Sequence, residues 1–270
     1  MGWVQRRGRA GDDAPMLMAI TREISAAFQA CELTHLPRVP IDLDRARAQH
    51  AAYEWALVEA GCTVRRLDSG PGMPDAVFVE DIAVALNEGA VICRPGAESR
   101  RAEMPGVVEA LARHGRPLEQ IKAPGTLDGG DVLVVGRQVF VGSSARTNRA
   151  GIDQLVRILA PVGYSVRAVP VGGCLHLKSA VTAVAPDAVL INRTWVPADP
   201  FADLSLVDID PDEPYAANAL AVGNVVVYPA AFPRTRERLE RRGLRVRPVD
   251  VEELQKAEGA VTCCSVIFSM

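Results

Sequence analysis

The sequence predicts an α/β protein assembled from a repeated unit. Pairs of short runs rich in β-branched residues flank tight turns, and four such pairs occur at intervals of roughly 40 to 50 residues. A helix-like segment follows at least three of them. Hydrophobic residues make up 49% of the 270 residues and charged residues 23%, which is typical of a folded globular chain. These observations favour an α/β fold with an internal repeat over a disordered or fibrous chain.

The region before the first repeat predicts a strand, a helix and a second strand. Residues 17–24 predict the first strand. Residues 42–60 show helical spacing, and Asp42 or Asp44 can cap this helix. A glycine ends the helix, and residues 63–67 then predict the second strand.

The repeats account for most of the remaining elements. The predicted hairpins span residues 84–94, 132–142, 181–192 and 220–228. The predicted helices span residues 101–114, 149–159 and 234–242, and residues 261–268 predict a buried C-terminal strand. One unit alone cannot bury its sheet face, so the units are expected to pack around a common centre. A two-layer α+β domain with unrelated hairpins is the alternative that periodicity alone leaves open.

Composition and charge exclude several classes of protein. The net charge of −3 comes without a basic stripe, which argues against a general nucleic-acid binder. No run approaches the roughly 18 apolar residues of a membrane helix, and residues 1–15 lack the apolar segment of a signal peptide. We expect a tail at residues 1–16, a single domain at 17–270 and a cytoplasmic location. The six cysteines form no CxxC pair and are expected to be reduced.

A group of carboxylates lies at residues 74–81. If this segment is a strand, alternation places Asp75 and Asp81 on one face and Glu80 on the other. Aspartate has a low strand propensity, so the pattern is unusual. Solvated carboxylates at an edge or turn are the commoner explanation, whereas a pair that faces a cavity would suit a cationic substrate.

Glycines and carboxylates also combine at residues 125–132. Glycine allows close approach of the backbone to a ligand, and Asp128 and Asp131 flank the glycine pair. The segment lacks the Lys-Ser/Thr of a P-loop and opens a strand rather than a helix. A bulge or tight turn into the second hairpin explains the same pattern and is compatible with a site.

A cysteine and a histidine are the candidates for covalent chemistry. His176 lies between two leucines, a setting more typical of a core histidine, and Cys263 would need a base close in space. Without metal-ligand spacing, these residues and the carboxylates point to a cysteine nucleophile. Arginines at residues 99–101 and 144–148 directly follow hairpins and suit carboxylate recognition.

Taken together, these segments resemble the dimethylarginine dimethylaminohydrolases of the guanidino-group-modifying superfamily. The matching stretches occur in the family order from about residue 17 onward: PDAVFVEDIA, RPGAESRR, GTLDGGDVLVVG, SARTN, LHLKS, YAAN, YPAAFPRTRERL and TCCS. The resemblance implies an α/β propeller, the pentein fold, with five pseudosymmetric ββαβ-type repeats around a central active-site channel.

The resemblance also implies roles for individual residues. Cys263 would be the nucleophile, His176 the general acid and base, and Asp128 the carboxylate beside the histidine. The implied substrate-binding residues are Asp75 and Asp81 with Glu80 beside them for the guanidinium, Arg100 and Arg146 for the α-carboxylate, Leu33 in a lid loop, and Ala257 through its backbone.

The implied reaction is hydrolysis of asymmetric dimethylarginine and monomethylarginine to citrulline and a methylamine. It would proceed through a covalent thiouronium at the cysteine and would need no metal or organic cofactor. The alternatives are the same chemistry on another guanidino compound, as in an arginine deiminase or amidinotransferase, and a non-catalytic binder of arginine derivatives. The expected partner is a small molecule, with no nucleic acid or membrane, for a monomer or a homodimer.

Overall fold

Five three-stranded sheets form the framework of the chain. The structure is a computed structural model that describes residues 16–70 and 72–270. The predicted tail at residues 1–16 lies outside the described residues except for Met16. In each sheet the middle strand pairs antiparallel with one neighbour and parallel with the other. The sheets are β15–β1–β2, β3–β4–β5, β6–β7–β8, β9–β10–β11 and β12–β13–β14.

The strands are short and occur as the hairpin pattern predicts. The first eight are β1 (Leu17–Arg22), β2 (Cys62–Leu67), β3 (Ala83–Ala85), β4 (Ala90–Ile92), β5 (Leu118–Gln120), β6 (Val132–Val135), β7 (Gln138–Ser143) and β8 (Ser165–Pro170). The others are β9 (Val181–Ala185), β10 (Ala188–Ile191), β11 (Ser205–Asp208), β12 (Leu220–Val222), β13 (Val225–Pro229), β14 (Arg245–Val249) and β15 (Val266–Ser269). All four predicted hairpins are confirmed as antiparallel pairs.

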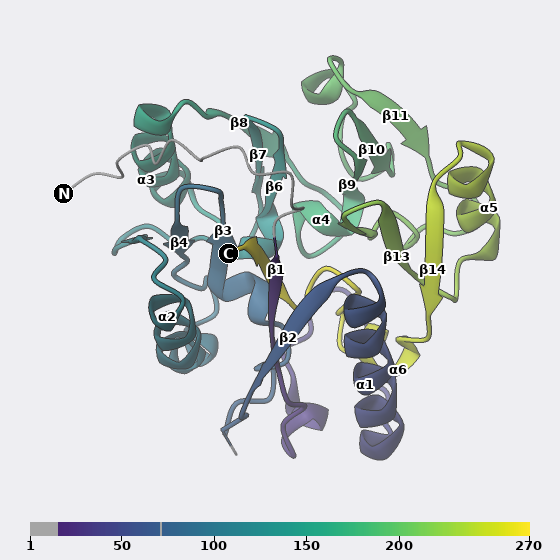
Figure 1. Cartoon of the computed structure of the whole chain (residues 1–270), viewed down its shortest axis with the longest axis horizontal. Coiled ribbons are helices and arrows are strands. Elements are labelled where there is room, and N and C mark those ends of the chain that lie inside the picture. The colour runs from purple at the N-terminus through teal and green to yellow at the C-terminus, as the bar shows by residue number, and fades with distance from the viewer. Residues whose placement is uncertain (1–15, 71) are drawn as a thin grey trace.

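The longer helices lie at the periphery of the sheets (Figure 1). The longer helices are α1 (Leu43–Glu59), α2 (Met104–Arg113), α3 (Arg149–Leu159) and α5 (Pro233–Arg241), and the short ones are α4 (Leu177–Ala180) and α6 (Glu252–Gln255). The 3₁₀ turns are η1 (Phe28–Ala30), η2 (Val79–Ile82), η3 (Glu98–Glu103), η4 (Gly129–Asp131), η5 (Ala160–Val162) and η6 (Asp199–Phe201). Within the described residues, no helix combines the length and the apolar character that crossing a membrane requires.

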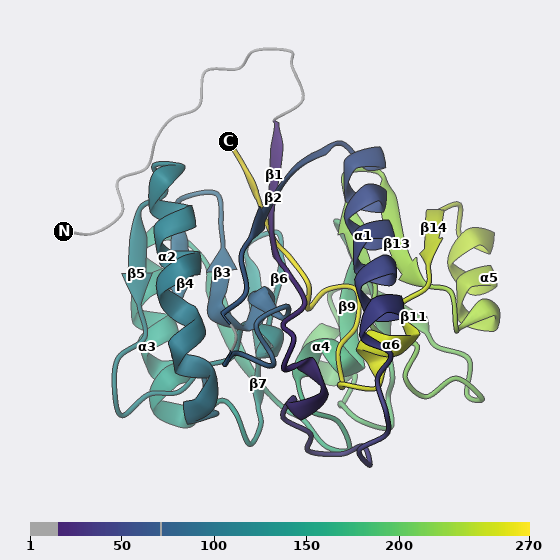
Figure 2. The same cartoon turned by 90° about the horizontal axis from the view of Figure 1, so that it is seen from below.

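The connections repeat a ββαβ order. Each of the four longer helices links the middle strand of a sheet to its parallel neighbour, and η6 takes that place in the sheet of β9, β10 and β11. The first and last segments of the chain meet in one sheet, where β15 pairs with β1. Figures 1 and 2 show the sheets around a common middle, with α4 near it and the longer helices outside. The predicted five-repeat α/β propeller is confirmed.

Local sequence explains the boundaries of α1. The Asp42 side chain accepts hydrogen bonds from the N–H groups of Asp44 and Arg45, so Asp42 is the cap and Asp44 lies in the first turn. After Ala60, Gly61 has a φ of 97°, a left-handed conformation in which glycine is favoured. The predicted helix at 42–60 is thereby confirmed to within one residue at each end.

The predicted strand at residues 261–268 is wrong in its first half, whereas the carboxylate segment at 74–81 forms turns, one of the two alternatives left open for it. Residues 74–82 form turns that end in η2, and residues 261–264 form turns before β15. In the first segment the N–H groups of Phe78 and Asp81 bond to carbonyls three residues earlier, which closes turns instead of a ladder. Both segments therefore have irregular backbone, and they lie near the common middle of the five sheets, where side chains can converge on a site.

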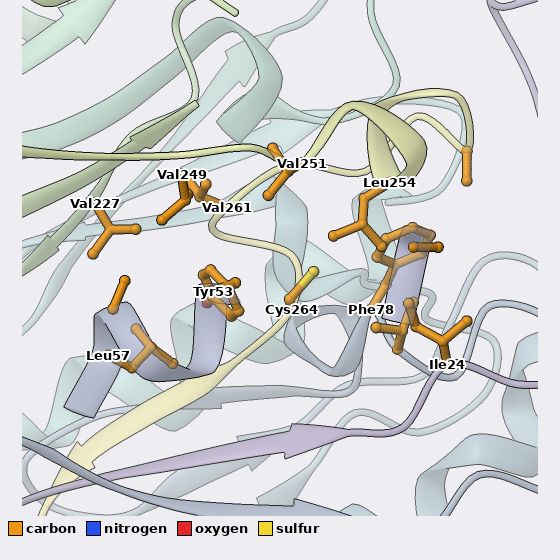
Figure 3. Close-up of a cluster of buried hydrophobic side chains, with 14 of the residues drawn as sticks. Ile24, Tyr53, Leu57, Phe78, Val227, Val249, Val251, Leu254, Val261 and Cys264 are labelled. Atoms are coloured by element: carbon orange, nitrogen blue, oxygen red, sulfur yellow. The ribbon is translucent and has the colours of Figure 1, made fainter. Parts of the chain in front are cut away.

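The core lies between adjacent repeats. One cluster joins α1 to β13, β14, α6 and the segment before β15, and Figure 3 shows Tyr53 of α1 beside Cys264. The Tyr53 hydroxyl also lies 2.7 Å from Ser265 Oγ in a buried hydrogen bond. This packing fixes the backbone on both sides of Cys264 and so positions its neighbour Cys263.

Candidate active site

Cys263 lies in the turn before β15 and is held by backbone contacts on both sides. Its N–H donates to Ala260 O at 3.2 Å, and its carbonyl accepts from Glu80 N–H at 3.1 Å. Thr262 donates its hydroxyl to Glu80 Oε2 at 2.8 Å. Cys263 is partly exposed whereas Cys264 is fully buried, and all six cysteines are free. The irregular turn thus presents one of two adjacent thiols to a cavity.

Two cavities share the Cys263 side chain. The acidic cavity has a volume of about 20 Å³, which leaves room for about one water molecule. It is lined by Glu32, Asp75, Phe78, Asp81, Arg100, Arg146, Leu175, His176, Ala257, Glu258, Gly259 and Cys263. The apolar cavity has a volume of about 280 Å³. It is lined by His35, Leu36, Cys174, Leu175, Ser179, Tyr215, Asn218, Ala231, Phe232, Gln255, Glu258, Gly259, Ala260 and Cys263.

The carboxylates of Asp75 and Asp81 both line the acidic cavity. Asp75 accepts the Glu32 N–H at 3.1 and 3.2 Å, and burial raises the pKa of its carboxyl although Arg100 opposes the rise. Burial also acts to raise the pKa of Asp81, but the charges of His176 and Arg100 outweigh it and hold this pKa at about 2. Asp81 is therefore a buried anion at neutral pH.

The glycine pair brings the acidic loop and the histidine together. A Cβ on Gly129 would lie 1.9 Å from Glu80 O, and one on Gly130 would lie 2.7 Å from both Asp81 Oδ1 and His176 Nδ1. Gly130 N–H donates to Asp81 Oδ1 at 2.9 Å. The close approach expected of these glycines is thus to protein groups of the site, in a turn that leads into β6.

His176 is the N-cap residue of the short helix α4, without a capping hydrogen bond from its side chain, and is buried between two aspartates. Its Nε2 lies 3.1 Å from Asp128 Oδ2, and its Nδ1 lies 3.8 Å from Asp81 Oδ1. Burial disfavours the imidazolium, but Asp81 and the hydrogen bond to Asp128 outweigh it and raise the pKa of His176 to about 9. Asp131 supports the same helix, since it accepts the Leu177 N–H at 2.9 Å.

The thiol of Cys263 is neutral before a ligand binds. Burial raises its pKa to about 12, and the charges of Glu80 and Asp81 act in the same direction. With His176 protonated, the free site therefore holds a thiol and an imidazolium. A cation beside the sulfur would lower the thiol pKa, because it would offset these carboxylates.

The two arginines predicted to bind a carboxylate have different surroundings. Arg100 is buried, donates twice to Glu103 and to the carbonyls of Asp75 and Phe78, and forms an ion pair with Asp81. Among the described residues, the Arg146 side chain has one hydrogen-bond contact, a long one of 3.5 Å from its Nη2 to Thr34 Oγ1. Arg100 thus orders the acidic loop, and Arg146 has more donors free for a ligand.

Glu80 points away from the acidic cavity. Its carboxylate pairs with Lys178 at 2.5 Å and accepts the Thr262 hydroxyl, on the wall of a separate cavity along β3, β6 and β12. Burial raises its pKa although Lys178 opposes the rise. Glu80 therefore supports the turn of Cys263 from behind, while its neighbour Asp81 faces the site.

The segment of Leu33 covers the acidic cavity. Leu33 packs on the core cluster that contains Ala257, and Ala257 lines the cavity. Glu258 follows with a φ of 58°, a left-handed conformation that is rare for this residue type. Its Oε1 accepts the N–H groups of Thr34, His35 and Leu36 at 2.9, 2.5 and 2.6 Å. Sequence reasoning missed Glu258, because its partners lie more than 200 residues away.

A metal site is not needed to explain the buried acids. Donor atoms of Asp81, Asp128 and His176 lie within 4.8 Å of one another, which is compatible with a cation. The same atoms already have partners: Asp128 contacts His176, and Asp81 pairs with Arg100. These ion pairs account for the cluster within the described residues.

Comparisons with known proteins agree with the geometry. A family model described as N,N dimethylarginine dimethylhydrolase, eukaryotic, matches residues 36–268. A protein of Streptomyces coelicolor named N(G),N(G)-dimethylarginine dimethylaminohydrolase is 42% identical over 93% of this chain and 97% of its own length. A protein of the same name from Pseudomonas aeruginosa is 39% identical over 84% of this chain and 90% of its own length.

A solved structure agrees with the fold as well. It is the Pseudomonas aeruginosa protein as a cysteine-to-serine variant complexed with citrulline. The TM-score is 0.88 at 36% identity, and the alignment covers 94% of this chain and all of that one. Because the family model matches residues 36–268 and these relatives are 39% and 42% identical over most of the chain, the chain belongs to the dimethylarginine dimethylaminohydrolase family.

Proposed function

We propose that the protein hydrolyses asymmetric dimethylarginine and monomethylarginine to citrulline and a methylamine, with Cys263 as the nucleophile. The observation that carries this proposal is the convergence of a thiol, an imidazolium and two buried carboxylates on one small cavity. The carboxylates select a cationic guanidinium over the neutral urea group of the product.

Binding prepares the thiol. Asp75 and Asp81 hold the guanidinium nitrogens, and Arg146 and Arg100 take the α-carboxylate. The backbone of Ala257 and the Leu33 segment complete the enclosure. The acidic cavity has room for about one water, so the segment of residues 32–36 must move to admit the substrate. The positive charge of the substrate then lowers the pKa of Cys263 so that a thiolate forms.

The chemistry proceeds in two halves. The thiolate forms a C–S bond to the guanidino carbon, and His176 donates its proton to the leaving methylamine as the C–N bond breaks. A cationic S-linked thiouronium remains on Cys263. His176, now neutral, removes a proton from water, and the hydroxide adds to the carbon to give a neutral tetrahedral adduct. The C–S bond then breaks as the hydroxyl proton of the adduct passes to the leaving sulfur, which releases citrulline and restores the Cys263 thiol beside a protonated His176. Asp128 holds the imidazole in position throughout.

The test is product release from defined substrates. Asymmetric dimethylarginine should give citrulline and dimethylamine in equal amounts, and arginine is run beside it. Citrulline and ammonia from arginine alone would make the protein a deiminase. No product from either compound would overturn the assignment, and a bound but unaltered substrate would then favour a binder.

Other properties stay predictions. A cytoplasmic location, a monomeric or homodimeric state and a single domain at residues 17–270 are compatible with this function. Size-exclusion chromatography with light scattering would measure the oligomeric state directly.

A further inference from the structure

The apolar cavity beside Cys263 has no part in the reaction described above. Its volume of about 280 Å³ approaches that of small-molecule sites, which begin near about 300 Å³. It shares four residues with the acidic cavity, namely Leu175, Glu258, Gly259 and Cys263. The two cavities therefore meet at the sulfur and at the residue before His176.

Two of the polar side chains on its wall, Glu258 and Asn218, are engaged with other protein groups. Glu258 Oε1 accepts three backbone N–H groups of residues 34–36. Asn218 bonds to Thr262 on both sides of its amide, and its Nδ2 also donates to the carbonyl of Lys178. Leu36, Phe232 and Tyr215 contribute apolar surface. Most of the wall is apolar surface, which favours an apolar ligand group because burying it removes apolar area from water. Glu258 Oε2 is buried without a hydrogen-bond partner among the described residues, so the wall also keeps a polar atom.

The shared wall is closely packed from the acidic side. A Cβ on Gly259 would lie 2.2 Å from Cε1 of Phe78, so the Phe78 ring fills the space behind this backbone. The acidic cavity cannot widen there without displacing Phe78, which is buried. Any bulk carried by the substrate near the sulfur therefore has more room on the apolar side.

The direction of the leaving group agrees with this arrangement. In the proposed function, on which this step rests, the leaving nitrogen lies near His176 to receive its proton. Leu175 precedes His176 and lines both cavities, so the apolar cavity lies next to the place of that nitrogen. We infer that the apolar cavity binds the substituent of the leaving nitrogen and that the protein hydrolyses N-alkylated arginines with unbranched groups longer than methyl.

The test compares Nω-propyl-L-arginine with monomethylarginine and asymmetric dimethylarginine by citrulline release. The wild-type protein should hydrolyse the propyl compound with a kcat/KM within about tenfold of the methyl compound, because each added methylene finds apolar wall. Turnover of the methylated compounds with none of the propyl compound would overturn the inference and leave the proposed function intact.

Two variants test whether hydrolysis of the propyl compound depends on the apolar cavity. Ala231→Leu fills the cavity from its wall, and Ala230→Leu is the matched control, since Ala230 is an exposed neighbour that does not line it. Ala231→Leu should lower kcat/KM for the propyl compound at least about tenfold. Its kcat/KM for asymmetric dimethylarginine should stay within about twofold of the wild-type value. Equal losses on both substrates, or the same loss in Ala230→Leu, would contradict the inference.

A binding measurement covers the case in which no substrate is hydrolysed. Calorimetry should then show Nω-propyl-L-arginine binding at least about fourfold more tightly than Nω-methyl-L-arginine, with the gain lost in Ala231→Leu. Equal affinities would overturn the cavity assignment separately from the failed reaction.

Discussion

The two cavities that meet at Cys263 differ in how their walls are built. The acidic cavity is small, and its charges are fixed by one another: Arg100 holds Asp81, and His176 lies between Asp81 and Asp128. The apolar cavity is more than ten times larger, at about 280 against about 20 Å³. The acidic cavity selects a positive charge at a fixed position, whereas the apolar cavity limits only the size of the group that it binds.

Because of this difference, we expect the acidic cavity to recognise the guanidinium and the apolar cavity to accept substituents of different sizes. Moving a buried charge disturbs every partner in its network, so changes in the acidic cavity should affect catalysis strongly. Changes in the apolar cavity should affect only substrates that reach it. Variants that alter one wall at a time can therefore test whether the two functions are independent.

The largest effect is expected at Cys263, the thiol among the four residues that both cavities share. Cys263→Ala should abolish hydrolysis of every substrate, with kcat reduced at least about 10⁴-fold, because the covalent step has no other nucleophile. Citrulline release measures the loss, and circular dichroism confirms that the fold is kept.

The adjacent thiol is the matched control. Cys264 is fully buried in the core cluster beside Tyr53, so Cys264→Ala should lower the free energy of unfolding by about 1 kcal/mol and leave kcat nearly unchanged. If Cys264→Ala removed activity and Cys263→Ala kept it, the assignment of the nucleophile would be wrong.

A smaller loss is expected from Asp81→Asn, which removes a charge from the acidic wall. kcat/KM should fall by about 10²- to 10³-fold, since both cation binding and the protonated state of His176 depend on this carboxylate. In the wild type, His176 loses its proton as the pH rises through about 9, so kcat/KM should fall above that pH. The variant should lose activity at a lower pH.

The pH dependence of kcat/KM distinguishes an electrostatic role of Asp81 from a structural one. An isosteric amide keeps the shape of the cavity, so a structural role alone would lower activity at every pH by the same factor. An alkaline limb that stays in place in Asp81→Asn would show that Asp81 does not support the charge of His176.

A binding effect is expected at the far end of the acidic cavity. Arg146→Ala should raise KM about 10- to 100-fold with a smaller change in kcat, because a charged hydrogen bond to the α-carboxylate is lost. The factor should be equal for methyl and propyl substrates. Arg149→Ala, an exposed arginine paired with Asp153 on α3, is the control. Unequal factors would show that the two cavities are coupled.

Part of this arrangement could be predicted from local sequence. The hairpins and α1 follow from short-range patterns, the alternation around tight turns and the Asp42 cap, and these were confirmed. Residues 261–264 were predicted wrongly as part of a strand, because their apolar residues resemble a strand while the Cys263 N–H closes a turn onto Ala260 O. At residues 74–81 the alternation left a strand and turn carboxylates open, and the backbone forms turns. In a segment rich in aspartate, an alternating pattern alone cannot distinguish a strand from a turn, because the tertiary contacts of the segment decide between them.

The site depended on partners far apart in the chain. Asp81 and Glu80 are adjacent, yet one faces Arg100 and His176 and the other faces Lys178 and a separate cavity. No local rule distinguishes them, and the roles came from resemblance to a family. The engagement of Arg100 by buried carboxylates was equally invisible in the sequence.

The smallest effect is expected at Glu258, which borders both cavities. A left-handed glutamate costs about 1 to 2 kcal/mol relative to glycine, and its carboxylate compensates by holding the N–H groups of residues 34–36. Glu258→Gly relieves the strain and removes the carboxylate together. Stability should therefore change little, while KM rises about two- to tenfold for methyl and propyl substrates alike. Thermal unfolding and KM measured on the same preparation separate the two contributions. An unchanged KM would mean that these three hydrogen bonds do not hold the segment over bound substrate. Closure would then depend on its other contacts, such as those of Glu32 with Asp75 and Ser99 and of Thr34 with Arg146.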